Sequence, residues 1–347
     1  MGSLTFAGLG LSGSDSMTFE AVKSAKEAEI IFLELYTSPI GTEEIDKIGK
    51  IVGKEVKVVP REYLEDGKKI LELASKVDVL LFVVGDPMIA TTHMDLKTRA
   101  ESMNIRTKIF HNASIISAIP GATGLHVYNF GKIVTLTGGN TPPATAYHTI
   151  FQNMIRGLHT LLLLEVQVEE GYSLPPEDGL KLLLSAEKDV KLGLIMQDTF
   201  VIVLSRLGQP DDFSISGGKL SNLSQRKYGY PPHAIVIPGR LHFTEVEALQ
   251  KILTTSEDEI RDNASTISKR SVIMVTKYSR KAKKALARAR KKVPDQYQSL
   301  FENVECYISD AERFLKNGED ELAVLSIGYA EGLLDALRFT GQLEIEW

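Results

Sequence analysis

The sequence has almost no cysteine and no long apolar run, and each absence excludes a class of protein. Cys306 is the single cysteine in 347 residues, so the chain has no internal disulfide and no cysteine-based metal cluster. A lone thiol also fits the reducing cytoplasm. No apolar run reaches the roughly 20 residues that a membrane-spanning helix requires, and the N-terminal residues lack the charged-then-apolar pattern of a secretory signal. We therefore expect a soluble, cytoplasmic protein with no membrane partner.

The charge is nearly balanced over the whole chain but unevenly distributed along it. The formal net charge of −5 gives no general preference for nucleic acid. Residues 263–294 contain eleven lysines and arginines and no acidic residue, whereas residues 295–347 are strongly acidic. The basic segment could contact the phosphates of an RNA, or it could pair with the acidic residues that follow it. We prefer the second interpretation.

Apolar, β-branched runs alternate with amphipathic segments from the N-terminus to Leu253. Strands are predicted at residues 4–11, 30–35, 55–59, 77–82 and 106–110, and then at 132–136, 160–166, 199–204 and 234–238. Helices are predicted at residues 18–29, 42–52, 67–76, 94–103, 176–189 and 243–253, with Ser14, Asp15 and Ser16 as the cap of the first. Strict alternation in the first half favours a parallel α/β sheet, and the strands from residue 132 onward are expected to form a second sheet. We predict two α/β domains, residues 1–115 and 116–260.

A helical appendage is predicted for residues 261–347. Apolar residues recur at helical spacing between residues 296 and 315, at Leu300, Val304, Ile308, Ala311 and Leu315. Asn317-Gly318 indicates a turn, and a second helix is expected at residues 321–338. The basic segment before this hairpin is expected to form a third helix.

The strand at residues 77–82 leads into the turn Gly85-Asp86-Pro87. Gly85 allows another group to approach the backbone closely, Pro87 fixes the exit of the chain, and Thr91-Thr92 offer a cap for a helix starting near His93. The carboxyl ends of strands are where open α/β sheets bind ligands. Taken alone, Gly-Asp-Pro favours the interpretation as a simple strand-to-helix turn over a ligand site. The lone Gly-x-Gly at residues 8–10 is a weak dinucleotide signal, and a NAD site is not favoured.

The longer string Gly85-Asp86-Pro87-Met88-Ile89-Ala90-Thr91-Thr92-His93 resembles the diphthine synthases, S-adenosylmethionine-dependent methyltransferases of the tetrapyrrole-methylase-like class (class III). Four other segments match that family in the same order, namely Phe6–Leu11, Ala113–Ile115, Thr123–Tyr128 and Pro231–His233. The resemblance extends from about residue 4 to about residue 255. Gly-Asp-Pro is shared by the wider class, whereas Ala-Thr-Thr-His is particular to diphthine synthases. The C-terminal segment resembles a small archaeal domain of unknown function, which suggests an archaeal source.

The resemblance implies two α/β domains with the cofactor cleft between them, followed by the α-helical domain. It implies transfer of methyl groups from S-adenosyl-L-methionine, leaving S-adenosyl-L-homocysteine. The acceptor would be the amino group of the aminocarboxypropyl-modified histidine of translation elongation factor 2, an intermediate of diphthamide biosynthesis, and repeated methylation is expected. A homodimer without a metal is also implied.

The residues that the resemblance implies as cofactor contacts come from these matched segments and from the strands of the second half. They are Leu11, Asp86, Ile89, Ser114, Ile115, Leu164, Leu207 and His233. For Asp86 the alternative is a turn-capping role. For His233 the alternative is that its backbone matters more than its ring.

Two other functions stay open. A tetrapyrrole methylase acting on a small macrocycle usually carries a Gly-x-Gly-Pro-Gly-Asp loop, which residues 8–13 lack. A cofactor-binding protein could dock RNA or the ribosome through the basic segment. The sequence identifies no group that removes the proton of the acceptor amine, so no general base is assigned. Five other histidines are interpreted as structural, and they lack the close His/Asp/Glu spacing of a metal site. They are His93, His111, His126, His159 and His242.

Overall fold

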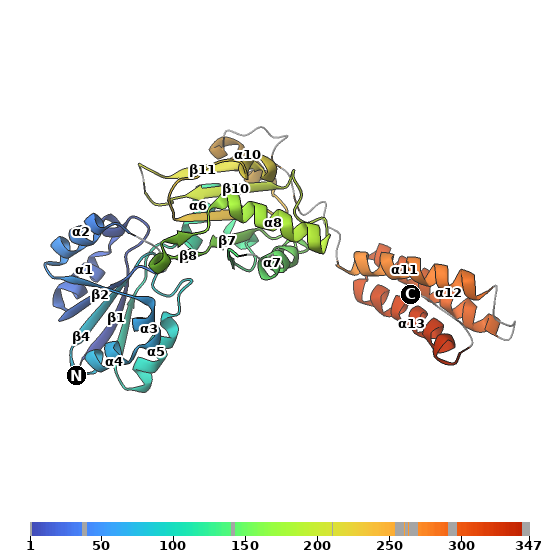
Figure 1. Ribbon diagram of the computed structural model, residues 1–347, viewed down its shortest axis with the longest axis horizontal. Helices are drawn as coiled ribbons and strands as arrows, with labels where there is room; N and C mark the ends of the chain where they lie inside the picture. Colours follow the sequence, from blue (N-terminus) through green and yellow to red (C-terminus); the bar gives the residue numbers. More distant parts are fainter. Residues whose placement is uncertain are drawn as a thin grey trace. The chain divides into compact units, whose positions relative to one another are not determined.

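The computed structural model describes residues 2–36, 40–139, 143–209, 211–253, 260, 263, 270–290 and 297–341, shown in Figure 1. Contacts within the chain divide it into two compact units, Met1–Ser265 and Thr266–Trp347. The first unit contains two five-stranded sheets and the second is helical. The fold class predicted from the sequence is confirmed. The division of the first unit at residues 115 and 116 stays a prediction.

The first sheet is wholly parallel, with the strand order β3-β2-β4-β1-β5. Its strands are β1 (Ser3–Gly8), β2 (Ile30–Glu34), β3 (Val56–Val59), β4 (Asp78–Val83) and β5 (Arg106–Phe110). All five were predicted, because each is a short apolar run bounded by turn residues. Every carboxyl end lies at the same edge of the sheet.

Helices cover both faces of this sheet. The helices α1 (Phe19–Glu27) and α2 (Thr42–Val52) pack on the face that carries Ala7 and Phe82. The helices α3 (Arg61–Asp66), α4 (Lys68–Lys76) and α5 (His93–Ser102) pack on the face that carries Phe6 and Leu81. Because the chain turns from β1 toward β2 and from β4 toward β5, the connections leave β1 and β4 in opposite directions. This reversal opens a crevice at the carboxyl ends of these two strands.

One predicted helix cap is wrong, and a second is right in position but makes no capping hydrogen bond. The first helix is capped by Thr18, whose side chain accepts a hydrogen bond from the Ala21 amide at 3.2 Å. Residues Gly13–Ser16 form a 3-10 turn (η1) instead, and Ser16 Oγ donates to the Leu9 carbonyl at 2.6 Å. At α5, Thr92 occupies the N-cap position without a side-chain hydrogen bond. The Ser16 hydroxyl thus bonds a nearby loop carbonyl in place of a helix amide, a competition that sequence alone does not resolve.

The second sheet is mixed, with the order β11-β10-β12-β7-β6 and only β6 and β7 parallel. Its strands are β6 (Val134–Leu136), β7 (Thr160–Leu164), β10 (Phe200–Ser205), β11 (Ser214–Lys219) and β12 (His233–Ile237). The edge strand β11 was not predicted, because its sequence Ser-Ile-Ser-Gly-Gly-Lys has little β propensity. A short hairpin follows β7, formed by β8 (Val166–Gln167), η3 (Val168–Glu170) and β9 (Tyr172–Ser173).

The helices of this half are α6 (Ile115–Thr123), α7 (Ala144–Met154), α8 (Pro176–Val190), α9 (Leu220–Leu223) and α10 (Phe243–Leu253), with a 3-10 turn η2 (Val127–Asn129). The helices α6 and α10 share one apolar core with β10 and β12. Residues 140–142, which precede α7, lie outside the described part of the chain.

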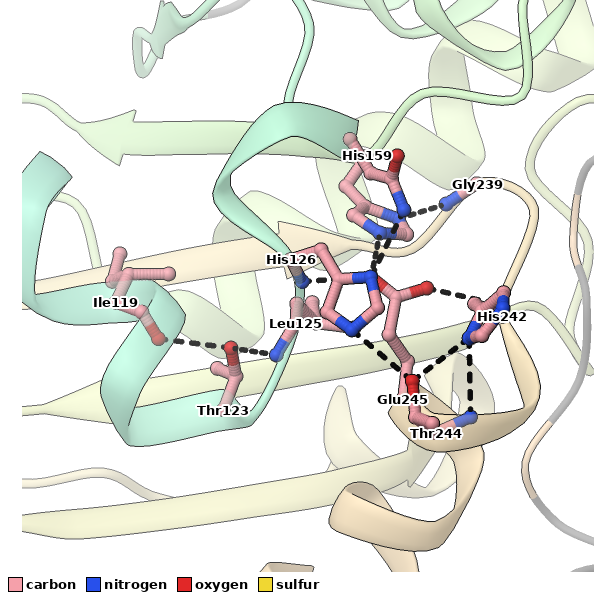
Figure 2. A network of polar contacts seen from close by, with 10 residues as sticks. Ile119, Thr123, Leu125, His126, His159, Gly239, His242, Thr244 and Glu245 are labelled. Carbon is pink, nitrogen blue, oxygen red and sulfur yellow. Dashed lines mark hydrogen bonds and ion pairs between the residues drawn. The ribbon is translucent and has the colours of Figure 1, made fainter.

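A buried carboxylate, Glu245 of α10, ties this helix to the segments before β7 and after α6 (Figure 2). The Gly239 amide donates to Nδ1 of His159 at 2.9 Å, so Nε2 carries the proton and donates to Glu245 Oε1 at 3.1 Å. The His126 and His242 amides also donate to Glu245, each at 2.7 Å. Burial opposes ionisation, but these hydrogen bonds outweigh it and hold the pKa of Glu245 below its usual value. These contacts fit the structural interpretation of the three histidines.

The second unit is a bundle of α11 (Arg270–Ala289), α12 (Gln298–Asn317) and α13 (Asp320–Phe339). The predicted apolar positions Val304, Ile308 and Ala311 lie in its core. Lys283 of the basic helix pairs with Glu312 at 2.6 Å, and Arg290 pairs with Glu305 at 2.8 Å. These pairs favour the interpretation in which the basic segment lies against the acidic hairpin. Throughout the described ranges, no helix combines the length and apolarity that crossing a membrane demands.

Candidate active site

One cavity of about 820 Å³ in the first unit brings the predicted cofactor residues together. The N-terminal half contributes loops that follow β1, β4 and β5. The other half contributes the end of β7, the loop after β10 and the start of β12. All eight predicted residues line it: Leu11, Asp86, Ile89, Ser114, Ile115, Leu164, Leu207 and His233.

The glycines at the ends of β1 and β4 bring two of these loops into direct contact. The Gly85 amide donates to the Gly10 carbonyl at 2.8 Å, and the Gly10 amide donates back to Gly85 at 3.1 Å. Both residues have positive φ, 80° for Gly85 and 69° for Gly10, a conformation that favours glycine. A Cβ on Gly8 would lie 2.5 Å from the Gly85 carbonyl oxygen. The loops therefore expose backbone at the crevice between β1 and β4.

Asp86 organises the loops around the cavity. Its Oδ1 accepts from the Met88 amide at 2.9 Å, and its Oδ2 accepts from His111 Nδ1 at 2.8 Å and from the Asn112 amide at 3.1 Å. The carboxylate thus caps its own turn and also binds the loop after β5. The turn-capping role was the alternative that the sequence left open, and the geometry supports it.

Ser114 begins α6 at the cavity. Its side chain accepts from the Ser117 amide, and Ser117 Oγ accepts from the Ser114 amide, so the two serines form a reciprocal capping box. This reciprocal cap fixes where the helix starts, and Ile115 follows directly on the cavity wall.

The ring of His233 is held by the protein. Its Nε2 donates to the Gly229 carbonyl at 3.3 Å, so Nδ1 accepts from Ser205 Oγ at 2.9 Å. Burial lowers the pKa of the His233 imidazole, which keeps the ring neutral at pH 7. With both ring nitrogens engaged, the geometry favours a contribution from the His233 backbone or ring face.

The two halves of the first unit contact each other directly beside the cavity. Ser12 Oγ donates to the Gly208 carbonyl, and a Cβ on Gly208 would lie 2.3 Å from Leu11 Cβ. This approach sets Leu11 and Leu207 on one apolar wall, although their sequence segments are far apart.

Sequence reasoning missed a second group of lining residues at the ends of β2 and β3. Tyr36 follows β2, and Arg61 follows β3 as the first residue of α3. His93 is buried, and its Nδ1 donates to the Pro87 carbonyl at 2.9 Å, so its Nε2 accepts from Tyr36 Oη at 3.1 Å. Their positions in the sequence could have identified Tyr36 and Arg61, because each lies just beyond the carboxyl end of a predicted parallel strand. The second half adds Glu165, Gln167 and Glu170 to the lining.

Comparison with known proteins agrees with this architecture. Residues 3–223 match the family model Tetrapyrrole (Corrin/Porphyrin) Methylases. Residues 277–343 match a second model, Protein of unknown function (DUF357). The description of this second model names no activity for the second unit.

Three relatives match the first unit along nearly their whole length. The diphthine synthase of Methanocaldococcus jannaschii is 39% identical over 252 residues, which cover 71% of this chain and 97% of that protein. That of Methanothermobacter thermautotrophicus is 33% identical over 251 residues, 72% of this chain and 95% of the relative. A diphthine synthase crystal structure superposes with a TM-score of 0.66 at 30% identity, covering 74% of this chain and 99% of that one. The chain therefore belongs to the diphthine synthase family of methyltransferases.

Proposed function

We propose that this chain transfers methyl groups from S-adenosyl-L-methionine to the amino group of the aminocarboxypropyl-modified histidine of translation elongation factor 2. The observation that carries the proposal is the cavity, which gathers all eight residues that the family resemblance implies as cofactor contacts. Its lining is what a sulfonium cofactor needs, since glycine-rich backbone lies beside an apolar wall that includes Leu11, Ile89 and Leu207.

The protein's part in such a reaction is positioning and exclusion of water. When bound, S-adenosylmethionine supplies an electrophilic methyl group, and the acceptor amine must be unprotonated to attack it. Holding the two reactants in line can supply about 7–11 kcal/mol of the barrier reduction. The Gly10–Gly85 contact would set the position of the donor, and the leucine walls would keep water from the reacting centre. No residue is assigned as general base.

The proposal includes repeated methylation, S-adenosylhomocysteine as the released product, a homodimer and a cytoplasmic location. Among the described residues, no cluster of three or more histidine, cysteine, aspartate or glutamate side chains is arranged to hold a metal ion. A tetrapyrrole substrate is not favoured, because the relatives named above are diphthine synthases. An RNA-docking role is not favoured either, because Lys283 and Arg290 pair within the bundle.

Methyl transfer from labelled S-adenosylmethionine tests the proposal. The acceptor is elongation factor 2 that carries the aminocarboxypropyl-histidine, with the unmodified factor as control. Label on the modified factor alone, with a mass increase in whole methyl units, supports the acceptor and counts the methyl groups. Cofactor binding without transfer to either protein would contradict it.

A further inference from the structure

The acceptor of the proposed reaction carries two charged groups on one carbon. The aminocarboxypropyl group ends in an amine, which receives the methyl groups, and in a carboxylate beside it. An enzyme that selects this side chain gains specificity by binding the carboxylate, since an analogue without it would leave a charged partner unpaired. The following inference rests on the proposed function and asks which residue binds that carboxylate.

The strand order separates the cavity into two regions. The predicted cofactor residues of the N-terminal half follow β4, β1 and β5, which are consecutive in the sheet. Tyr36 and Arg61 follow β2 and β3, which continue the same edge on the other side of β4. Neighbouring strands lie about 4.8 Å apart, so the end of β3 is roughly 10 Å from the end of β4. That distance suits a side chain bound next to the methyl donor.

Arg61 is the one lysine or arginine among the described residues that line the cavity. Its Nε donates to Glu65 Oε1 at 2.7 Å within α3, and its guanidinium carbon lies 5.8 Å from the centre of the Tyr36 ring. A guanidinium presents five donors in a planar fork that matches a carboxylate, and an arginine can hold a protein partner and a ligand carboxylate at the same time. Tyr36 is in turn held by His93, which is itself bonded to the Gly-Asp-Pro turn.

The other half supplies negative charge to the same cavity. Glu165 and Glu170 line it from the segment around β8. Glu165 accepts from the Gly138 amide at 2.7 Å and from Gln167 Nε2 at 2.8 Å, which fixes its orientation. The cavity therefore offers a cation on one side and carboxylates on the other, an arrangement complementary to a group with both an amine and a carboxylate.

We infer that Arg61, set beside Tyr36, binds the carboxylate of the aminocarboxypropyl group and so determines the specificity of the enzyme for the modified histidine. The bound carboxylate places the neighbouring amine toward the loops after β4 and β1. Arg61 makes no contact with the methyl donor in this assignment, so its loss affects the acceptor and leaves cofactor affinity unchanged.

Steady-state kinetics on the full-length chain test this assignment, with the modified elongation factor 2 as acceptor. Arg61→Gln is expected to raise the KM for the acceptor 10- to 100-fold, and Arg61→Lys to raise it less, because lysine keeps the charge but loses the fork. The Kd for S-adenosylmethionine should stay within twofold of wild type in both. Lys68→Gln is the matched control, since Lys68 is exposed, lies outside the cavity and removes the same charge nearby.

The outcomes separate the two proposals. Transfer by Arg61→Gln with a wild-type KM for the acceptor would overturn the carboxylate assignment and leave the proposed function intact. If Arg61→Gln weakened binding of both S-adenosylmethionine and the acceptor, the carboxylate assignment would also be overturned, because the substitution would then have distorted the whole cavity. A wild-type chain that methylates neither form of the factor would overturn the proposed function, and the assignment of Arg61 with it.

Discussion

Gly10 and Gly85 exchange two backbone hydrogen bonds across the carboxyl ends of β1 and β4, at 2.8 and 3.1 Å. The two residues are 75 positions apart in the sequence, and this contact joins Gly85, which lines the cavity, to the loop that carries Leu11. A Cβ on the nearby Gly8 would lie 2.5 Å from the Gly85 carbonyl oxygen and would push the two loops apart. The close approach of the loops therefore depends on glycines, which have no Cβ at these positions.

Gly8→Ala tests this dependence. Its Cβ would lie 2.5 Å from the Gly85 carbonyl oxygen and 2.8 Å from Asn112 Cβ, so the loops must move apart. We expect unfolding in urea to show a loss of about 1–3 kcal/mol, and calorimetry to show weaker S-adenosylmethionine binding. Gly41→Ala is the control, because a Cβ there meets no atom within 4 Å. Equal effects of the two substitutions would contradict the close-approach argument.

Asp86→Asn should loosen the loop after β5. The amide keeps an acceptor for one partner, but its NH₂ group would face either the Met88 amide or the Asn112 amide, which are both donors. The expected cost is about 1–3 kcal/mol in the free energy of unfolding, with at least tenfold weaker cofactor binding. His111→Ala should cost less, because the His111 side chain is 68% exposed. A larger effect of His111→Ala on cofactor affinity would argue that the imidazole itself binds the ligand.

Glu245 should contribute a pH-dependent part of the stability. Its folded-state pKa lies below the usual value of 4.5, so the stabilisation is present above that value and is lost as pH falls through the folded pKa. Glu245→Gln should therefore destabilise the protein by about 1–3 kcal/mol at pH 7, and the difference from wild type should shrink below pH 4.5. Urea unfolding between pH 7 and pH 3 measures both. Glu247→Gln is the control, because Glu247 lies on the exposed side of the same helix and its loss should leave the free energy of unfolding unchanged at both pH values. If Glu245→Gln were less stable than wild type by the same amount at pH 7 and pH 3, the stabilisation would not depend on ionisation of Glu245.

Ile308→Ala should destabilise the second unit selectively. Ile308 is buried among the three helices, and truncation of a core isoleucine typically costs about 2–5 kcal/mol. Hydrogen exchange in the full-length chain should quicken in α11, α12 and α13 and stay unchanged in β1 and β4. Leu322→Ala is the control, since that side chain is 43% exposed. Faster exchange throughout the first unit would show that the two units unfold together.

Much of the fold followed from local patterns in the sequence. The five strands of the first sheet are short apolar runs between turn residues, and α2 and α10 begin and end where their sequence predicts. The matched segments also identified eight residues that share one cavity. The strand and helix predictions succeeded because strand burial and helix periodicity act over a few residues, whereas the cofactor role of the eight residues stays a prediction.

Tertiary structure alone decided the rest. The edge strand β11 forms because β10 offers it hydrogen bonds, not because Ser-Ile-Ser-Gly-Gly-Lys prefers to be extended. Thr18 and Ser16 are equally able to cap a helix, and the contact between Ser16 and the Leu9 carbonyl assigned the task to Thr18. Tyr36 and Arg61 join the cavity because their strands lie beside β4 in the sheet. Strand order is set by packing between distant segments, so the sequence determined the elements and their turn chemistry, whereas the fold determined which side chains face one another.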